Sequence, residues 1–377
     1  MLGGLHREVR RAYAQAGMLY ELHLDLLYQC DLDCEHCYLD DKSRRILPTA
    51  FWTDVIDQAA DLGVSHLLMS GGEAFLRKDL LDLVAHARGR GLFVSLKSHG
   101  GYIDEAVAAR LAALQVSSVW LSYYASDPAI HDAITRRPGS HRKTRAALEH
   151  LARAGIVTVA SIAVMQRNVD HWRAAVDECR ALGVLPSVDA KMRAALSGDE
   201  FPVALRAELP DLVRIEGHHL GFEGEACLPG AVDDAWVDEK LCAAGHLALY
   251  VGPEGEVTPC VAWPMALGNL AHGDRLADLW RASPALARVK AYRNVDRALC
   301  ASCEVRADCD FCAGQAFVAT ADPMQAIANL CWTTRAKTLA RAAALGLPEP
   351  PMPAGLRDAS GAPPAAPRFP IRVVPAR

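Results

Sequence analysis

The sequence predicts an α/β protein with a parallel, helix-covered sheet and a second, smaller domain. From residue 20 to about 192, six short apolar runs alternate with longer segments of helical period, the pattern of repeated βα units. Six units are fewer than the eight of a closed barrel. With 377 residues and 51% hydrophobic content, the chain can bury a large core and a satellite domain. We therefore expect a partial, open (β/α)6 barrel of the TIM-like type.

The predicted strands are short and bounded by turn residues. They cover residues 20–28, 64–70, 91–98, 116–124, 156–165 and 184–192. The segments between them have helical period, and the first places one apolar face on Phe51, Val55, Ile56, Ala59 and Leu62 before a stop at Gly63. In such folds the chemistry lies at the carboxyl ends of the strands.

The rest of the chain divides by composition. Residues 1–19 form an N-terminal extension, 20–193 the barrel, 194–241 a bridging region without clear period, 242–335 a cysteine-rich domain and 336–345 a C-terminal helix. The last segment, 346–377, contains nine prolines and few apolar side chains to offset the entropy of ordering, so we expect a disordered tail.

Composition excludes several classes of protein. There is no run of 18 apolar residues and no apolar stretch of the kind that a secretory signal has near the N-terminus, so we expect a cytoplasmic protein that does not span a membrane. A formal net charge of −5 argues against nucleic-acid binding. In a reducing compartment, the twelve cysteines are expected as metal ligands or thiols.

Three cysteines follow the first predicted strand with the spacing C-x3-C-x2-C: Cys30, Cys34 and Cys37. One interpretation is half of a zinc site, completed by a residue such as His36. The other is an iron–sulfur cluster held by three thiolates, which leaves one iron open to a substrate or cofactor. An open iron implies catalysis.

At these residues the chain resembles the radical S-adenosylmethionine (radical SAM) superfamily. The second strand ends in "MSGGEAFL", where that family has a glycine-glycine-glutamate motif that receives the ammonium group of S-adenosylmethionine (SAM). The resemblance implies that SAM fills the open iron site and is cleaved to a 5'-deoxyadenosyl radical. It assigns SAM binding to Gly71, Gly72 and Glu73, although Ala74 replaces the usual proline.

The resemblance extends to weaker features. Ser122 ends the fourth strand, where a serine commonly touches SAM in this family, and "SHG" at 98–100 stands where the family often has threonine-asparagine-glycine. Lys191 and Arg193 follow the sixth strand, where a basic residue could pair with the SAM carboxylate. Strand-end packing and a solvated face are the alternative interpretations of these residues.

Seven further cysteines lie within about ninety residues and imply metal: Cys242, Cys260, Cys300, Cys303, Cys309, Cys312 and Cys331. Two zinc ribbons are one interpretation. The pattern also resembles the SPASM extension of radical SAM enzymes, which implies two auxiliary [4Fe–4S] clusters, although its last cysteine spacing is two residues here rather than three. By that analogy an outer cluster is held by Cys300, Cys303, Cys309 and Cys331, and an inner one by Cys242, Cys260 and Cys312. Cys227 is a candidate fourth inner ligand, and an open iron, a hydrogen donor or an inert thiol are its alternatives.

The resemblance implies three [4Fe–4S] clusters, SAM, and oxidation of a ribosomally made precursor peptide by crosslinking or a similar change. It also implies an external electron donor such as flavodoxin or ferredoxin. About 20 residues precede the first strand, so we expect a separate leader-peptide-binding protein or no leader. A small-molecule intermediate is the alternative substrate. Sulfatase-maturase-like oxidation is disfavoured because Val261 stands where that branch carries an acidic base.

Overall fold

The computed structural model describes residues 2–39, 41–222 and 242–356. It divides into two compact units. Unit 1 comprises Met1–Ala163, Asp170–Asp189 and Cys242–Ala291, and unit 2 comprises Val164–Val169, Ala190–Leu241 and Tyr292–Arg377. Within the described ranges, no helix has both the length and the apolar composition needed to cross a bilayer.

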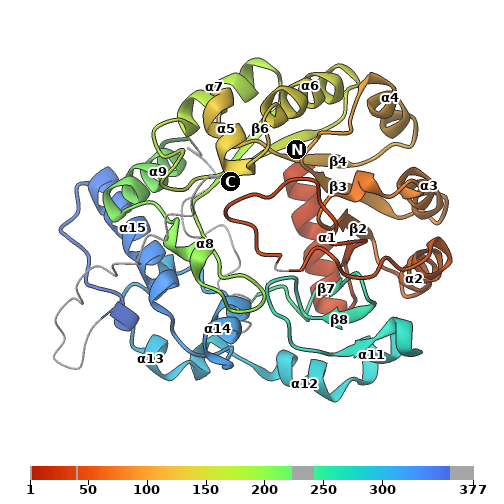
Figure 1. The fold of residues 1–377 in the computed structure, drawn as a ribbon. Coiled ribbons are helices and arrows are strands. Elements are labelled where there is room, and N and C mark those ends of the chain that lie inside the picture. Colours follow the sequence, from red (N-terminus) through yellow and green to blue (C-terminus); the bar gives the residue numbers. More distant parts are fainter. Residues whose placement is uncertain (1, 40, 223–241, 357–377) are drawn as a thin grey trace. The chain divides into compact units, whose positions relative to one another are not determined.

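Unit 1 is built on a sheet to which all six predicted strands contribute. They are β1 (Glu21–Asp25), β2 (His66–Ser70), β3 (Phe93–Ser98), β4 (Ser118–Ser122), β5 (Thr158–Ala163) and β6 (Leu185–Asp189). Each pairs in parallel with the next, so the strand order follows the sequence. The predicted open parallel barrel is confirmed, and the carboxyl ends of its strands all lie at one edge (Figure 1).

Helices connect the strands and cover the outer side of the sheet, where Figure 1 shows α2, α3, α4 and α6. The helices of unit 1 that precede β6 are α1 (Leu2–Ala16), α2 (Thr49–Asp61), α3 (Leu80–Gly89), α4 (Glu105–Ala113), α5 (Pro128–Thr135), α6 (Ser140–Arg153) and α7 (Trp172–Ala181). The buried residues of α2 are Trp52, Val55, Ile56, Gln58 and Ala59. Val55, Ile56 and Ala59 are buried as predicted, whereas Phe51 and Leu62 stay half-buried and Trp52 enters the core instead.

The sheet continues past β1 with strands that we did not predict. They are β7 (Ala248–Val251), β8 (Glu256–Thr258) and β9 (Gly268–Asn269), followed by η2 (Leu270–His272), α11 (Leu276–Ala282) and α12 (Pro284–Ala291). β7 pairs in parallel with β1, and β8 and β9 follow it in antiparallel pairing. The first part of the cysteine-rich segment, Cys242–Ala291, therefore belongs to unit 1, and the part from Tyr292 onward belongs to unit 2.

Unit 2 is helical. Its elements are α8 (Phe201–Ala204), α9 (Leu209–Phe222), η3 (Asn294–Asp296), α13 (Ala298–Ala301), η4 (Arg306–Asp308), α14 (Ala313–Thr320), α15 (Ala328–Leu345) and η5 (Ala354–Leu356). The expected bridging region thus contains α9, although its sequence shows no clear period. The predicted boundary between residues 335 and 336 falls inside α15, which also carries Cys331.

The start of the expected disordered tail is folded. Cys331, Trp332 and Leu356 form a small buried cluster, against which Leu209 and Met352 pack. Arg335 on α15 donates from Nη1 to the carbonyl oxygen of Pro350 at 2.6 Å. Proline-rich chain is ordered here because a buried guanidinium and an apolar cluster hold it, neither of which composition reveals. The rest of the tail, 357–377, lies outside the described residues.

Candidate functional site

The three N-terminal cysteines lie on the loop that follows β1, at the carboxyl edge of the sheet. Backbone hydrogen bonds hold this loop to the end of α5: Asp33 N donates to Thr135 O at 3.2 Å, and Glu35 N donates to Ile134 O at 3.0 Å. Cys30, Cys34 and Cys37 carry free thiols and are all half-buried. The loop therefore presents three sulfur ligands from a fixed backbone.

The thiols lie close enough to influence one another. Burial raises the pKa of Cys34 to about 12, and negative charge on Cys37 and Cys30 adds to the effect. Burial likewise raises the pKa of Cys30 to about 11, against an opposing hydrogen bond from the Leu32 N–H. Thiolates in this position need a neutralising cation, and thiolate sulfur is the ligand that iron–sulfur clusters use. The donor set fits such a cluster.

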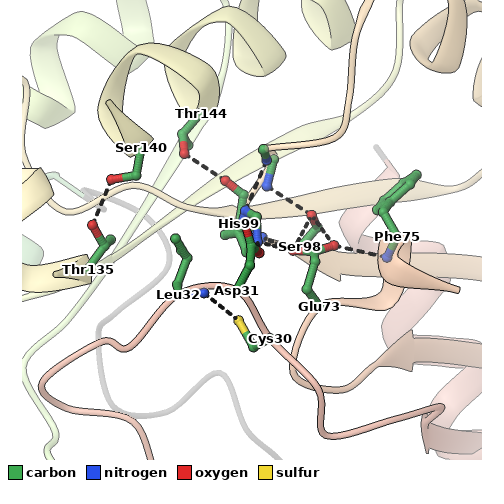
Figure 2. A network of polar contacts seen from close by, with 12 residues as sticks. Cys30, Asp31, Leu32, Glu73, Phe75, Ser98, His99, Thr135, Ser140 and Thr144 are labelled. Carbon is green, nitrogen blue, oxygen red and sulfur yellow. Dashed lines mark hydrogen bonds and ion pairs between the residues drawn. The ribbon is translucent and has the colours of Figure 1, made fainter. Parts of the chain in front are cut away.

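Glu73 is the centre of a polar network beside this loop (Figure 2). Its carboxylate is fully buried and accepts hydrogen bonds from Ser98 Oγ, 2.9 Å from both oxygens, from His99 N at 2.9 Å and from Phe75 N at 3.0 Å. Bonds to a charged acceptor are about twice as strong as neutral ones. The carboxylate is therefore held rigidly at the end of β2.

His99 links Glu73 to the cysteine loop. Its Nδ1 accepts from Gly101 N at 3.0 Å, so the proton lies on Nε2, which faces Asp31 Oδ1 at 2.9 Å and Glu73 Oε2 at 3.1 Å. Burial raises the pKa of the Asp31 carboxyl, but its electrostatic interaction and hydrogen bond with His99 lower the pKa, and the net pKa is below the usual value. Ligand atoms of Cys30, Asp31 and His99 all lie within 4.8 Å of one another. We did not predict Asp31 or His99, although "SHG" at 98–100 was a signal.

The glycine pair before Glu73 serves a close approach of backbone to backbone. Gly71 has a φ of +140°, and a Cβ there would lie 2.2 Å from Leu27 O. A Cβ on Gly72 would lie 2.4 Å from the carbonyl oxygens of both Tyr28 and Gln29. We expected these glycines to admit a ligand. In the structure they let the end of β2 pair with the segment that leads into the cysteine loop, which positions Glu73 relative to Cys30.

The remaining predicted SAM residues are placed as follows. Ser122 is the last residue of β4 and is half-buried. Lys191 and Arg193 belong to unit 2, where Lys191 Nζ lies 2.9 Å from Asp310 Oδ2. The structure thus gives Lys191 a carboxylate partner within its own unit, and a role in binding SAM stays a prediction for all three residues.

A buried network that we did not predict lies between β1 and β7. Tyr250 on β7 donates to Asp25 Oδ2 at 2.9 Å, and its hydroxyl lies 2.8 Å from that of Tyr28. His23 Nε2 lies 3.1 Å from Asp25 Oδ1. Because Asp25 is fully buried, these partners take the place of water around its carboxylate. The network ties the extra strand to the first barrel strand just before the cysteine loop.

The seven C-terminal cysteines divide between the units. Cys242 and Cys260 belong to unit 1, on either side of β7 and β8, and Cys312 belongs to unit 2, where it precedes α14. The predicted inner set is therefore drawn from both units. Cys227 lies outside the described residues.

The predicted outer set lies within unit 2, with three cysteines around α13 and η4 and Cys331 on α15. Burial raises the pKa of Cys331 to about 12, and negative charge on the other three, Cys309, Cys300 and Cys303, adds to it. Ala354 N donates to Cys303 Sγ at 3.4 Å, and a Cβ on Gly355 would lie 2.6 Å from Cys331 Sγ. The structure thus gathers these four thiols under the folded start of the tail. Their donor chemistry fits a cluster.

Comparison with known proteins identifies the family to which this chain belongs. The radical SAM superfamily pattern matches residues 26–179, and the SPASM iron–sulfur cluster-binding domain pattern matches residues 242–310. Together with the open barrel and its cysteine loop, these matches define a radical SAM enzyme with a SPASM domain. Over 370 residues the chain is 30% identical to the PqqA peptide cyclase of Streptomyces rochei, which covers 90% of this chain and 96% of that relative. The chain belongs to the SPASM-containing branch of the radical SAM superfamily.

Solved structures support the fold. The structure of Streptococcus suis SuiB bound to the precursor peptide SuiA superimposes with a TM-score of 0.66 at 16% identity, covering 86% of this chain and 80% of SuiB. The structure of anSMEcpe with bound SAM superimposes with a TM-score of 0.68 at 15% identity, covering 86% of this chain and 98% of that one. At such identities the likeness concerns the fold.

Proposed function

We propose that this enzyme uses SAM-derived radical chemistry to form an intramolecular crosslink in a ribosomally made peptide. The observation that carries this is the 30% identity to a PqqA peptide cyclase across 96% of that relative's length. The rigid cysteine loop and the buried Glu73 beside it support the same reaction class. We further propose that the enzyme works in the cytoplasm.

The N-terminal site has the following proposed roles. Cys30, Cys34 and Cys37 hold a [4Fe–4S] cluster, and bound SAM would supply the 5'-deoxyadenosyl radical. Glu73 receives the ammonium group of SAM, and its bonds from Ser98 and His99 fix the carboxylate in place before SAM arrives. Gly71, Gly72, Ser122, Lys191 and Arg193 complete the proposed SAM contacts.

Two auxiliary [4Fe–4S] clusters complete the proposed cofactors, for three clusters in all. The outer one is held by the four thiols gathered in unit 2, Cys300, Cys303, Cys309 and Cys331. The inner one is held by Cys242, Cys260 and Cys312, with Cys227 as its fourth ligand.

The proposed reaction is a net oxidation of the peptide. Two C–H bonds break and one new bond joins the two sites. One hydrogen atom leaves in 5'-deoxyadenosine and the other leaves as a proton. The remaining electron needs an acceptor, and this is the role we assign to the auxiliary clusters. SAM is consumed once per crosslink. The proposed partners are the precursor peptide, a leader-peptide-binding protein and a flavodoxin or ferredoxin.

The test is a single-turnover assay with reduced, reconstituted enzyme and the precursor peptide whose gene lies closest to that of the enzyme. We expect the peptide to lose two hydrogen atoms and one 5'-deoxyadenosine to form per modified peptide. If SAM is regenerated, the oxidative reaction is wrong. If the peptide is unchanged while a small metabolite changes mass, the peptide substrate is wrong.

A further inference from the structure

Arg297 is a buried arginine with unused hydrogen-bond donors. Its side chain is 3% exposed, and among the described residues neither Nε nor Nη1 has a hydrogen-bond partner. A guanidinium that is removed from water without an acceptor destabilises the fold, so buried arginines are normally paired. The two N–H groups therefore indicate an anionic acceptor that the protein residues around them do not supply.

The position of Arg297 indicates which acceptor. It immediately precedes α13, three residues before Cys300, and its carbonyl oxygen accepts from Ala301 N at 2.8 Å. The guanidinium carbon lies 3.9 Å from the ring centroid of Phe311, which stands between Cys309 and Cys312 in the sequence. The backbone of Arg297 is thus held at the start of α13, and its guanidinium lies over an aromatic face among the cysteine segments of unit 2.

Among these cysteines, Cys300 interacts electrostatically with the positive charge of Arg297. A four-thiolate [4Fe–4S] cluster carries net negative charge and offers sulfur acceptors. Hydrogen bonds to those sulfurs are one of the means by which proteins set a cluster's reduction potential.

We propose that Arg297 donates N–H···S hydrogen bonds to the outer auxiliary cluster and thereby raises its reduction potential. This inference rests on the proposed cluster at Cys300, Cys303, Cys309 and Cys331. Reduction adds a negative charge, which a fixed guanidinium stabilises more than it stabilises the oxidised cluster. The role suits a cluster that must accept an electron from the product radical.

The experiment is a redox titration of the intact enzyme, followed by electron paramagnetic resonance. The outer-cluster signal is the one that is lost in Cys303→Ala. We expect Arg297→Gln to lower the ratio of reduced to oxidised outer cluster about tenfold at a fixed potential, equivalent to ~59 mV for one electron. Arg297→Lys keeps the positive charge but loses the planar set of N–H donors, so we expect a smaller shift in the reduction potential.

Arg341→Gln is the matched control. It removes the same charge next to the same segment, but Arg341 is already paired with Asp308 at 2.9 Å and is 35% exposed. We expect no shift in its outer-cluster potential. An unchanged potential in Arg297→Gln with full iron content overturns the inference, as does an equal shift in the Arg341 control.

A measurement on the unmodified protein tests the inference even if the variants fail to fold. Enzyme produced in cells that are supplied with arginine carrying ¹⁵N in the guanidinium group should show ¹⁵N coupling to the reduced outer cluster in pulsed electron paramagnetic resonance. Absence of that coupling overturns the inference. If Cys303→Ala instead leaves the iron content and all cluster signals unchanged, there is no outer cluster, and the failure belongs to the proposed function.

Discussion

Replacing Gly72 by alanine tests how the end of β2 positions the site. The added Cβ would lie 2.4 Å from the carbonyl oxygens of Tyr28 and Gln29, so the two backbones must move apart by at least ~0.6 Å to reach the closest approach that real contacts show. That movement breaks two hydrogen bonds, from Gly72 N to Leu27 O at 2.8 Å and from Glu73 N to Gln29 O at 2.9 Å. At about 0.5–1.5 kcal/mol each, the loss is roughly 1–3 kcal/mol before any strain.

Anaerobic denaturant unfolding and iron analysis measure this effect. We expect Gly72→Ala to lower the free energy of unfolding by about 2–4 kcal/mol, because backbone displacement adds to the lost bonds. Iron at the cysteine loop should also fall, since Cys30 follows Gln29 directly. Gly89→Ala is the control: nothing lies within 4 Å of its Cβ, at the end of α3, so the substitution should be neutral or slightly stabilising. Equal stability and equal iron in the two variants would mean that the close backbone approach at Gly72 does not position the cysteine loop.

Three further predictions follow from single side chains. Glu73→Gln should weaken SAM binding by roughly 1.5–3 kcal/mol, the worth of one hydrogen bond to a charged group, and unchanged SAM affinity by calorimetry contradicts the role of Glu73. Tyr250→Phe removes a donor from the buried Asp25 carboxylate and should cost about 1.5–3 kcal/mol of unfolding free energy, so a neutral effect counts against the network. Burial lowers the pKa of His131 to about 3, and positive charge on His141 contributes to this decrease. In the unfolded state the pKa is about 6.5, so between these two values only the unfolded state binds the proton. Stability should therefore fall by about 2 kcal/mol between pH 7 and pH 5, and His131→Asn should remove that slope.

Local sequence pattern was enough to predict the barrel. Its strands are apolar runs bounded by turns, and its helices carry a regular apolar face, so each element is recognisable in its own residues. β7 was missed because its four residues, Ala248–Val251, become a strand only through pairing with β1, more than 200 residues away. The order of residues 346–356 likewise depends on distant partners, among them the buried Arg335.

The site was predictable where its residues are close in sequence. The spacing of Cys30, Cys34 and Cys37 and the motif ending in Glu73 are contiguous signals. His99 was not assigned, because its bonds to Asp31 and Glu73 arise from strand order rather than from sequence spacing. The role of Arg297 could not be predicted from the sequence either, since only its burial shows that its donors lack an acceptor.

SAM cleavage at the cysteine loop can be measured directly. Reduced, reconstituted enzyme is incubated with SAM, and 5'-deoxyadenosine is quantified for the unmodified protein and for Cys30→Ala/Cys34→Ala/Cys37→Ala. We expect product from the unmodified enzyme and none above background from the triple variant, which should keep the iron of the C-terminal clusters. Undiminished 5'-deoxyadenosine from the triple variant would contradict the assignment of the SAM-cleaving site.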